Sequence, residues 1–280
     1  GSRYYTYVWT LVLCLEVCAG MARPPRVLVL DRPNPLGGAM VEGPGIQAGF
    51  HSFVGLHDVP TRHGLTMGEL AQLCRAERNL DLELDVLQIQ GWGRRDLFDN
   101  TGLPWVLPSP NMPTPETALV YPGGCLVEGT NLSEGRGTTR PFELTGAPYI
   151  QGHSLARSQE AEGLPGVRFR PVGFTPTFQK HGGQLCGGIQ LHLTDRDKFR
   201  SLRTGVALLR AARRGWPDAF QWRKEAYEFV AETPAIDLLA GGPWLRRGVD
   251  GGADLDELCA PWREQEQAFL ERRRPHLLYQ

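Results

Sequence analysis

The stretch RVLVLD, from Arg26 to Asp31, is a short apolar run that ends on a carboxylate. Such a run is typical of a strand that is buried on both faces of a parallel sheet. The loop RPNPLGG, rich in proline and glycine, follows it directly. Because open α/β sheets hold their ligands at the carboxyl ends of the strands, this stretch predicts both a parallel sheet and the edge where a site would lie.

Helix and strand patterns alternate around this strand. Thr66 and Glu69 have the spacing of a capping box, and apolar residues on one face follow them, which predicts a helix from Met67 to Arg78. The run LDVLQIQGW, from Leu84 to Trp92, predicts a second buried strand. Helix, strand, loop, helix and strand in this order indicate an α/β fold with a parallel sheet and crossover connections.

The first twenty residues, GSRYYTYVWTLVLCLEVCAG, imitate a secretion signal in their basic residue, apolar run and small residues. However, Glu16 interrupts the apolar run and three tyrosines crowd its front, so we interpret the segment as a buried helix that feeds the first strand. A domain that opens in this way would have further strands ahead of residue 1. We therefore expect it to be incomplete at its N-terminus.

The second half of the chain has a different pattern. The proline-rich passage from Thr101 to Glu116 predicts a long loop, because proline removes donors from a sheet, and Thr114 with Pro115 predicts the start of a helix that reaches toward Cys125. Beyond residue 147 we expect a smaller α+β domain. Its elements would be a helix near Ser154–Glu162, the strand pair VRFRPVGFTPT and GIQLHLTD, and helices at Leu202–Arg213, Arg223–Val230 and Asp254–Arg273.

Composition narrows the class of partner. The net charge of -1, with 41% hydrophobic and 22% charged residues, is ordinary for a globular protein and gives no general attraction to nucleic acid or to anionic lipid. No membrane span is expected. The six cysteines form no C-x-x-C pair, so we predict free and mostly buried thiols, with Cys14 and Cys18 on the core-facing side of one helix.

The densest polar stretch is EGTNLSEGRGTTRPFE, from Glu128 to Glu143. Its glycines allow the backbone to approach a ligand closely, and its carboxylates and arginines can either pair with one another or bind a polar substrate. A surface turn is the simpler interpretation. The stretch lies near the predicted domain boundary at residue 130, however, and clefts between domains are favoured ligand sites.

Several stretches, dense between Asp31 and Tyr149, resemble the exo-β-N-acetylmuramidase family typified by NamZ. The resemblance continues more thinly to the C-terminal FLERRRPHLLY. It is specific because the strings are long and occur in a matching order. They are DRPNPLGG with VEGP, RHGLTMGELA, GWGRRDLF, TGLPWVLPSPNMPT, YPGGCLVEGTNLSEGRGTTRPFE and GAPY.

The resemblance implies a glycoside hydrolase that releases N-acetylmuramic acid from the non-reducing end of peptidoglycan fragments. It implies a Rossmann-like domain, here residues 1–130, and an auxiliary α+β domain, here residues 131–280, with the site between them. Muropeptides or disaccharides would be the partners, and the protein would be periplasmic or secreted. The resemblance also implies that the family's Glu-His-Gly motif, with its proposed catalytic glutamate, would lie ahead of residue 1. The similar string here is Arg62-His63-Gly64, with arginine in the carboxylate position.

Glycosidic cleavage uses a carboxylic acid and a carboxylate, about 5–5.5 Å apart when configuration is retained and about 6.5–9.5 Å apart when it is inverted. Glu128 and Glu134 are the best-placed candidates for these catalytic groups, and Glu42 in VEGP is a weaker third that we assign to substrate binding. Each of the first two could equally be a structural partner of Arg136.

Muramic acid carries a lactyl carboxylate, which a guanidinium can bind with two parallel hydrogen bonds. Arg136 is the first candidate for this role and Arg62 the second, although either could form a salt bridge instead. His63 could shuttle a proton or orient the substrate, or simply bond the backbone. The remaining candidate sugar-binding residues are Asn111, Asn131 and Thr138.

No metal or cofactor is expected, because the histidines and cysteines form no compact ligand pattern and no phosphate-binding loop occurs. Two other classes of function stay open. One is a noncatalytic protein that binds muropeptides or cell wall at the same site. The other is a nucleotide- or phosphate-binding α/β protein, although the sequence lacks the glycine-rich turn that such proteins place between a strand and a helix.

Overall fold

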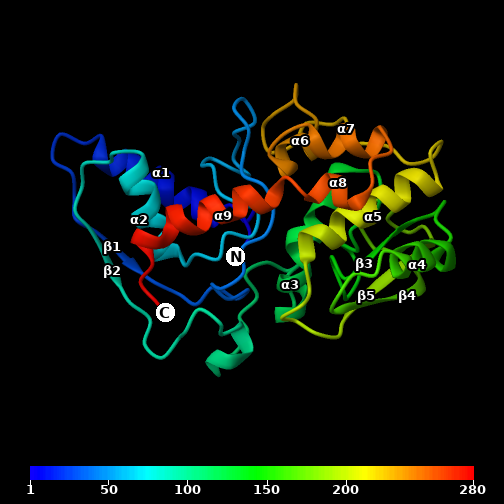
Figure 1. The fold of residues 1–280 in the computed structure, drawn as a ribbon, viewed down its shortest axis with the longest axis horizontal. Coiled ribbons are helices and arrows are strands. Elements are labelled where there is room, and N and C mark those ends of the chain that lie inside the picture. The colour runs from blue at the N-terminus through cyan, green and yellow to red at the C-terminus, as the bar shows by residue number, and fades with distance from the viewer. The chain divides into compact units, whose positions relative to one another are not determined.

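The computed structural model describes residues 1–280, which form two compact units (Figure 1). The first unit contains residues 1–104 and 262–280, and the second contains residues 105–261. The division therefore falls at Pro104 and Trp105, earlier than the predicted boundary at residue 130. The C-terminal segment also returns to the first unit, which a simple division into two halves does not anticipate.

The sheet of the first unit consists of two parallel strands, β1 (Val27–Leu30) and β2 (Leu84–Leu87). Helix α2 (Met67–Glu77) lies between them in the sequence. The structure thus confirms the predicted strands and the helix with its capping box. The second strand ends earlier than the apolar run LDVLQIQGW suggested.

Burial on both faces of β1 was predicted, and this prediction is wrong. Val29 is buried, but Leu28 and Leu30 on the opposite face are 59% and 60% exposed. Successive side chains of a strand point to opposite faces. Val29 packs with Leu15 and Ala71, which cover only one face of the sheet.

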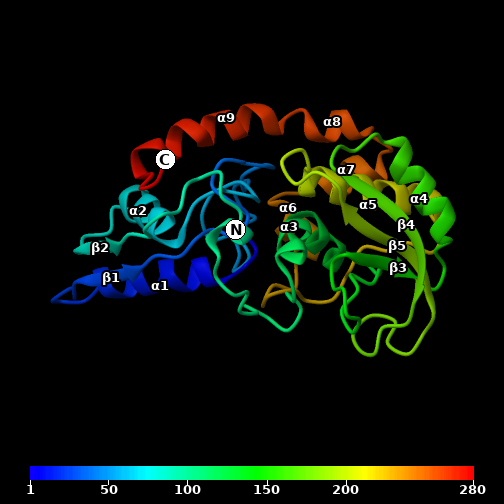
Figure 2. The same cartoon turned by 90° about the horizontal axis from the view of Figure 1, so that it is seen from below.

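Three helices build the main core of the first unit: α1 (Tyr7–Ala19), α2 and α9 (Trp262–Arg273). Figure 2 shows α2 between α9 and α1. The predicted N-terminal helix is confirmed, and its buried side chains share this core with residues from the other two helices. The fully or nearly fully buried members are Val8, Trp9, Val12, Val59, Leu65, Leu70, Leu73, Cys74 and Phe269.

All six cysteines are free, as predicted. The expectation that Cys14 and Cys18 face the core is wrong, because Cys14 is exposed and Cys18 only half-buried. The buried face of α1 runs through Val8, Val12 and Leu15 instead, and the two thiols lie beside this face. The other four cysteines are buried.

The second unit contains an antiparallel sheet in the order β3-β5-β4. The predicted strand pair corresponds to β4 (Val167–Phe174) and β5 (Cys186–Leu193), and β3 (Leu144–Ala147) was not predicted. The predicted helices α3 (Pro115–Gly124), α4 (Gly152–Ala161) and α5 (Ser201–Gly215) are confirmed.

Helices α3 and α5 cross at two glycines. A Cβ atom added to Gly123 would lie 1.9 Å from the carbonyl oxygen of Ser201, and one added to Gly205 would lie 2.3 Å from the carbonyl oxygen of Gly123. Only glycine permits so close a contact between two backbones. This contact fixes α3, and with it the start of the polar loop Glu128–Glu143, against the core of the second unit.

The C-terminal half contains two corrections. The predicted helix Arg223–Val230 does not form; Tyr227 and Val230 instead pair across a tight turn. The predicted helix Asp254–Arg273 is broken at Ala260–Pro261 into α8 (Leu255–Cys259) and α9. Five short elements were not predicted: α6 (Ala235–Ala240), α7 (Trp244–Asp250) and the 3-10 helices η1 (Phe98–Thr101), η2 (Cys125–Gly129) and η3 (Arg274–His276). None of the helices is long and apolar enough to cross a membrane.

Candidate functional site

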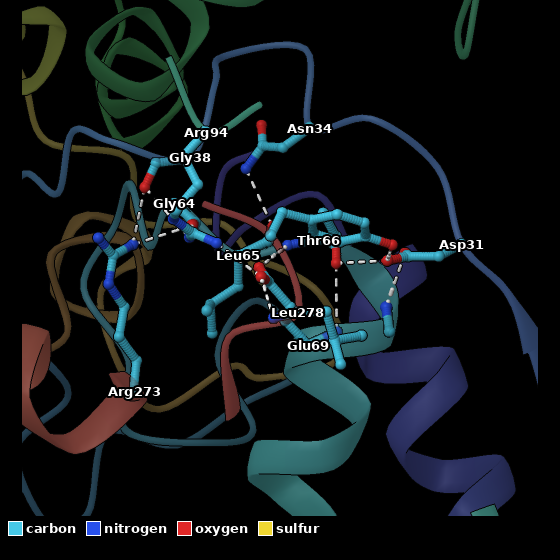
Figure 3. Close-up of polar contacts among 12 residues, drawn as sticks. Asp31, Asn34, Gly38, Gly64, Leu65, Thr66, Glu69, Arg94, Arg273 and Leu278 are labelled. Atoms are coloured by element: carbon cyan, nitrogen blue, oxygen red, sulfur yellow. Dashed lines mark hydrogen bonds and ion pairs between the residues drawn. The ribbon is translucent and has the colours of Figure 1, made fainter. Parts of the chain in front are cut away.

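Both units contain a dense polar cluster that includes predicted site residues or lies beside them. The cluster of the first unit starts at Asp31, where β1 ends (Figure 3). The Asp31 carboxylate accepts hydrogen bonds from the Gly68 N–H at 2.8 Å, the Thr66 hydroxyl at 2.6 Å and the Tyr279 hydroxyl at 2.6 Å. Burial and this bond raise the pKa of Tyr279. The strand end is thereby tied to the N-terminus of α2 and to the C-terminal segment.

Glu69 is the second carboxylate of this cluster and is completely buried. It accepts hydrogen bonds from the Thr66 N–H at 3.0 Å, the Leu278 N–H at 2.9 Å and Arg94 Nη1 at 2.6 Å. Since both of its oxygens are engaged, Glu69 caps α2 and neutralises a buried arginine. Its role is structural.

Arg273 approaches the same region from the end of α9 (Figure 3). Its Nη1 donates to the carbonyl oxygens of Gly38, His63 and Gly64 at 2.9–3.0 Å. Burial, together with the positive charge of Arg94, lowers the pKa of Arg273 to about 10. Gly64 has φ +60°, and a Cβ atom there would lie 2.5 Å from Arg273 Nη1, so glycine is required.

The predicted substrate-binding residues Glu42, Arg62 and His63 come together beside this cluster. The backbones of Glu42 and Arg62 exchange two hydrogen bonds, of 3.0 and 2.9 Å, and all three side chains are buried. The guanidinium of Arg62 donates to the Leu36 carbonyl and to Met40 Sδ. The structure therefore brings Glu42 next to Arg62, twenty positions further along the chain, and His63 follows Arg62 directly.

His63 is 1% exposed, and its Nδ1 accepts a hydrogen bond from the Leu65 N–H at 3.1 Å. The ring proton of the neutral imidazole must therefore sit on Nε2, which has no hydrogen-bond partner. Burial, followed by positive charges that include Arg273 and Arg3, holds the pKa of His63 well below its usual range. His63 is thus a neutral buried donor.

The cluster of the second unit centres on Arg136 in the polar loop. Its Nη2 donates to Glu128 Oε1 at 2.6 Å, and its Nε lies 3.2 Å from Glu134 Oε1. The guanidinium also lies over the Phe142 ring, 5.1 Å from the centroid. Burial alone would lower the pKa of Arg136, but the two carboxylates outweigh it and raise the pKa.

Two residues from distant segments complete this charged cluster. Lys180 Nζ lies 3.0 Å from Glu134 Oε2 and donates to carbonyl oxygens of the same loop, and the Tyr227 hydroxyl donates to Glu128 Oε2 at 2.8 Å. The side chains of Arg136 and Lys180 remain 25% and 21% exposed. The cluster therefore combines two fixed carboxylates with two cations that solvent still reaches.

The side chains of Asn131 and Thr138, two other predicted binding residues, make hydrogen bonds within the second unit. Asn131 Oδ1 accepts from the Tyr149 hydroxyl at 2.7 Å, and its Nδ2 donates to the Ala219 carbonyl at 2.8 Å. Burial raises the pKa of Tyr149 to about 12. The Thr138 hydroxyl donates to the Gly135 carbonyl at 2.6 Å and shapes the loop. Asn111 is half-buried in the proline-rich loop, away from these contacts.

The sequence did not identify Lys180 or Tyr227, because both are far from the loop in sequence and Tyr227 falls in a segment that was predicted to be helical. Asp31 could have been identified, since it ends the first strand at the sheet edge where ligands are expected. The polar loop itself lies wholly inside the second unit and not at the division between units. No three His, Cys, Asp or Glu side chains are placed to share a metal ion.

Two family models match almost the entire chain. The model for the N-terminal part of the exo-β-N-acetylmuramidase NamZ matches residues 1–116, and the model for the C-terminal part matches residues 119–279. The chain belongs to the NamZ family. The resemblance inferred from the sequence strings is thus confirmed, and so is the mixed α/β fold class.

Three known proteins are similar to this chain over its full length. The peptidoglycan β-N-acetylmuramidase NamZ of Bacillus subtilis strain 168 is 44% identical over 279 residues, and the chain spans 65% of its length, just under two thirds. Two crystal structures of DUF1343 family proteins from Bacteroides fragilis NCTC 9343 are also similar. One has a TM-score of 0.89 at 29% identity and the other 0.79 at 30%, and the chain covers 72% and 73% of them.

Proposed function

We propose that the protein is a β-N-acetylmuramidase that releases N-acetylmuramic acid from the non-reducing end of peptidoglycan fragments. The observation that carries this proposal is the 44% identity, along the whole chain, with a Bacillus subtilis protein named for β-N-acetylmuramidase activity on peptidoglycan. Both NamZ family models match in order along the chain. We further propose muropeptides or disaccharides as partners and a periplasmic or secreted location, where such fragments occur.

For the first unit we propose a Rossmann-like arrangement. The parallel pairing of β1 and β2 across α2, and the position of Asp31 at the carboxyl end of β1, support it. Glu42, Arg62 and His63 are the proposed substrate-binding residues of this unit; the backbone pairing of Glu42 with Arg62 and the burial of all three polar side chains support this.

In the second unit we propose that Glu128 and Glu134 supply the catalytic carboxylates. Glycoside hydrolysis needs a proton donor and a second carboxylate, and both side chains here are held by the same guanidinium. The Glu128 side chain is 13% exposed and that of Glu134 is 4% exposed. Glu128 is therefore the better candidate for the proton donor, and Glu134 for the second carboxylate.

The lactyl carboxylate of muramic acid supplies the proposed specificity. The side chains of Arg136 and Lys180 are 25% and 21% exposed, so a substrate anion could approach these two cationic residues from the solvent side. Asn131 and Thr138 would then act through the shape of the loop, since their side chains are already bonded within the unit.

The test compares two chromogenic substrates, 4-nitrophenyl β-N-acetylmuramide and 4-nitrophenyl β-N-acetylglucosaminide. We expect release of nitrophenol from the muramide only. Equal turnover of both would contradict the muramic specificity. Binding of a muramic saccharide without any turnover would instead identify a noncatalytic binding protein.

A further inference from the structure

Backbone strain in this protein is concentrated around one loop. Non-glycine residues rarely adopt left-handed φ angles, and where they do the strain tends to mark ligand sites. Six non-glycine residues have such angles, and five of them lie in or beside the polar loop Glu128–Glu143. These five are Phe142 (64°), Gln179 (66°), His181 (59°), Glu228 (46°) and Phe229 (69°).

Each strained segment touches the charged cluster of the second unit. Phe142 lies under the Arg136 guanidinium. Gln179 and His181 flank Lys180, which is paired with Glu134. Glu228 and Phe229 directly follow Tyr227, whose hydroxyl donates to Glu128. The residues with strained backbone therefore lie next to the side chains that contact the proposed catalytic carboxylates.

The turn at Glu228 and Phe229 is the most unusual of these strained segments, because two consecutive non-glycine residues have positive φ. Tyr227 and Val230 exchange two backbone hydrogen bonds, of 2.9 and 3.0 Å, and the two residues between them both have positive φ. This is the pattern of a type I′ turn, in which Asn-Gly is the favoured pair. The chain instead uses Glu-Phe, and the Phe229 side chain is 95% exposed.

The turn is held firmly against the polar loop. Besides the Tyr227 hydroxyl bond, the Arg223 N–H donates to the Gly129 carbonyl at 2.9 Å, and the Arg223 guanidinium lies over the Tyr227 ring, 5.2 Å from its centroid. The ends of a tight turn lie within about 7 Å of each other. The turn that carries the exposed Phe229 side chain is thus held by Tyr227, the residue whose hydroxyl donates to Glu128.

We propose that Phe229 is a stacking platform for a pyranose ring of a peptidoglycan saccharide bound at the Glu128–Arg136 cluster. The proposal rests on the proposed function. A pyranose has an apolar C–H face and a polar rim, so it can cover an aromatic ring while its hydroxyl and amide groups bind charged side chains. Covering Phe229 would also remove a large apolar surface from water.

The surroundings of Phe229 favour a sugar over a protein partner. Protein interfaces have cores with several apolar residues and few charges. Phe229 is instead a single exposed aromatic residue among exposed charged ones. These neighbours are Lys224, Glu225, Glu228 and Glu232.

The experiment uses the intact protein and the disaccharide of N-acetylmuramic acid β-1,4-linked to N-acetylglucosamine. Affinity is measured by titration calorimetry, and KM and kcat by product release. Phe229→Gly should weaken binding and raise KM about tenfold, the loss of a well-placed aromatic contact, with kcat within about twofold. The melting temperature should stay or rise, because glycine relieves the positive φ.

Two matched variants separate the effect of the aromatic ring from the effect of backbone strain. Phe229→Trp should keep the affinity, since a larger aromatic ring replaces the platform. Glu228→Asn relieves strain at the neighbouring position and leaves the ring in place, so it should raise the melting temperature without a change in affinity.

Unchanged affinity of Phe229→Gly for the disaccharide would overturn the proposal, and so would a lowered melting temperature with normal affinity, which would identify a packing residue. If the unaltered protein binds the disaccharide without cleaving it, the proposed hydrolase function fails, yet a loss of affinity in Phe229→Gly still supports the platform. If the unaltered protein does not bind it at all, both proposals fail.

Discussion

His63 has a consequence for stability that can be measured without a substrate. Its pKa in the folded state is depressed, so the unfolded chain binds a proton more readily. The stability that His63 contributes is complete above the unfolded pKa of about 6.5 and is lost as pH falls below that value. Unfolding free energy should therefore decline with falling pH, by up to about 1.4 kcal/mol per pH unit for one proton.

His63→Asn should flatten this decline, because the asparagine oxygen can still accept from the Leu65 N–H and does not titrate. Urea unfolding between pH 7.5 and 5 measures the effect. Burial also lowers the pKa of His57, so this histidine contributes to the same decline of unfolding free energy with falling pH. His57→Asn is the comparison variant that separates the contributions of the two histidines. An unchanged slope in His63→Asn would mean that His63 is protonated in the folded protein.

Glu128→Gln separates catalysis from structure. The glutamine oxygen can still accept from Arg136, and its amide nitrogen can donate to the Tyr227 hydroxyl oxygen, so we expect little change in melting temperature but a loss of kcat of about 100-fold or more. Activity on the muramide substrate and thermal unfolding are the two measurements. Normal turnover in the folded variant would reduce Glu128 to a structural partner of Arg136.

Glu134→Gln should lower kcat as well. Expressed as free energies, we expect the loss of transition-state stabilisation to exceed the loss of unfolding free energy. The substitution leaves two cations, Arg136 and Lys180, without their buried carboxylate, which costs about 1–3 kcal/mol because both cations are partly exposed. If the variant unfolds early but keeps its turnover when folded, Glu134 only braces the loop.

The sequence indicated the polar loop correctly as a place where charged side chains gather, because glycine, glutamate and arginine crowd together there. It also left open whether Arg136 pairs with the glutamates, and the structure has this pairing. Lys180 could not be predicted, since only the folding of the β4–β5 connection brings it to Glu134. The residue types in the sequence therefore indicate which charged groups a loop contains, whereas the tertiary fold decides which distant side chains pair with them.

At the scale of elements, the capping box of α2 does more than start a helix. The Thr66 hydroxyl accepts from the Glu69 N–H and donates to Asp31, so it joins the helix to the end of β1. Thr66→Ala should cost about 2 kcal/mol, the sum of a lost cap and a lost buried hydrogen bond. Thr66→Ser keeps both contacts and should cost much less.

Chemical denaturation measures both Thr66 variants, and Thr114→Ala at the start of α3 is the comparison. That threonine also caps its helix, with a bond to the Thr117 N–H, but its hydroxyl makes only a long contact of 3.5 Å with Glu143, which precedes β3. We expect a cost of about 1 kcal/mol there. Equal costs for Thr66→Ala and Thr114→Ala would contradict a joining role for Thr66.

Local signals predicted the elements well where they were strong. Thr66, Glu69, Thr114 and Pro115 set helix starts that the structure reproduces. The exposed face of β1 was mispredicted because burial depends on which helices cover the sheet. Likewise, the segment around Tyr227 has ordinary helical residues, but its bond to Glu128 and the pairing with Val230 hold it in a turn.

At the scale of the whole molecule, Phe269 of α9 completes the core that α1 and α2 form. Phe269→Ala should destabilise this core by about 3–5 kcal/mol. Hydrogen exchange should consequently accelerate in Tyr7–Ala19 and Met67–Glu77. Gln267→Ala, at an exposed position of the same helix, is the control and should leave exchange unchanged.

Equal acceleration throughout the β3-β5-β4 sheet would contradict this assignment, because that sheet belongs to the other compact unit. The return of α9 could not be predicted from the sequence. Its apolar residues are few, and no local pattern identifies a core to which a distant helix belongs. Only the joint burial of Phe269 with residues of α1 and α2 reveals it.

The return of residues 262–280 bears on the order in which the two units can fold during synthesis. Domains generally fold from the N-terminus as the ribosome extends the chain. Here residues 105–261 can complete their core before α9 is translated, and until then the apolar side chains of α1 and α2 lack their contact with Phe269. Once residues 105–261 have been synthesised, the nascent chain would thus carry a second unit with a complete core and a first unit that still lacks Phe269.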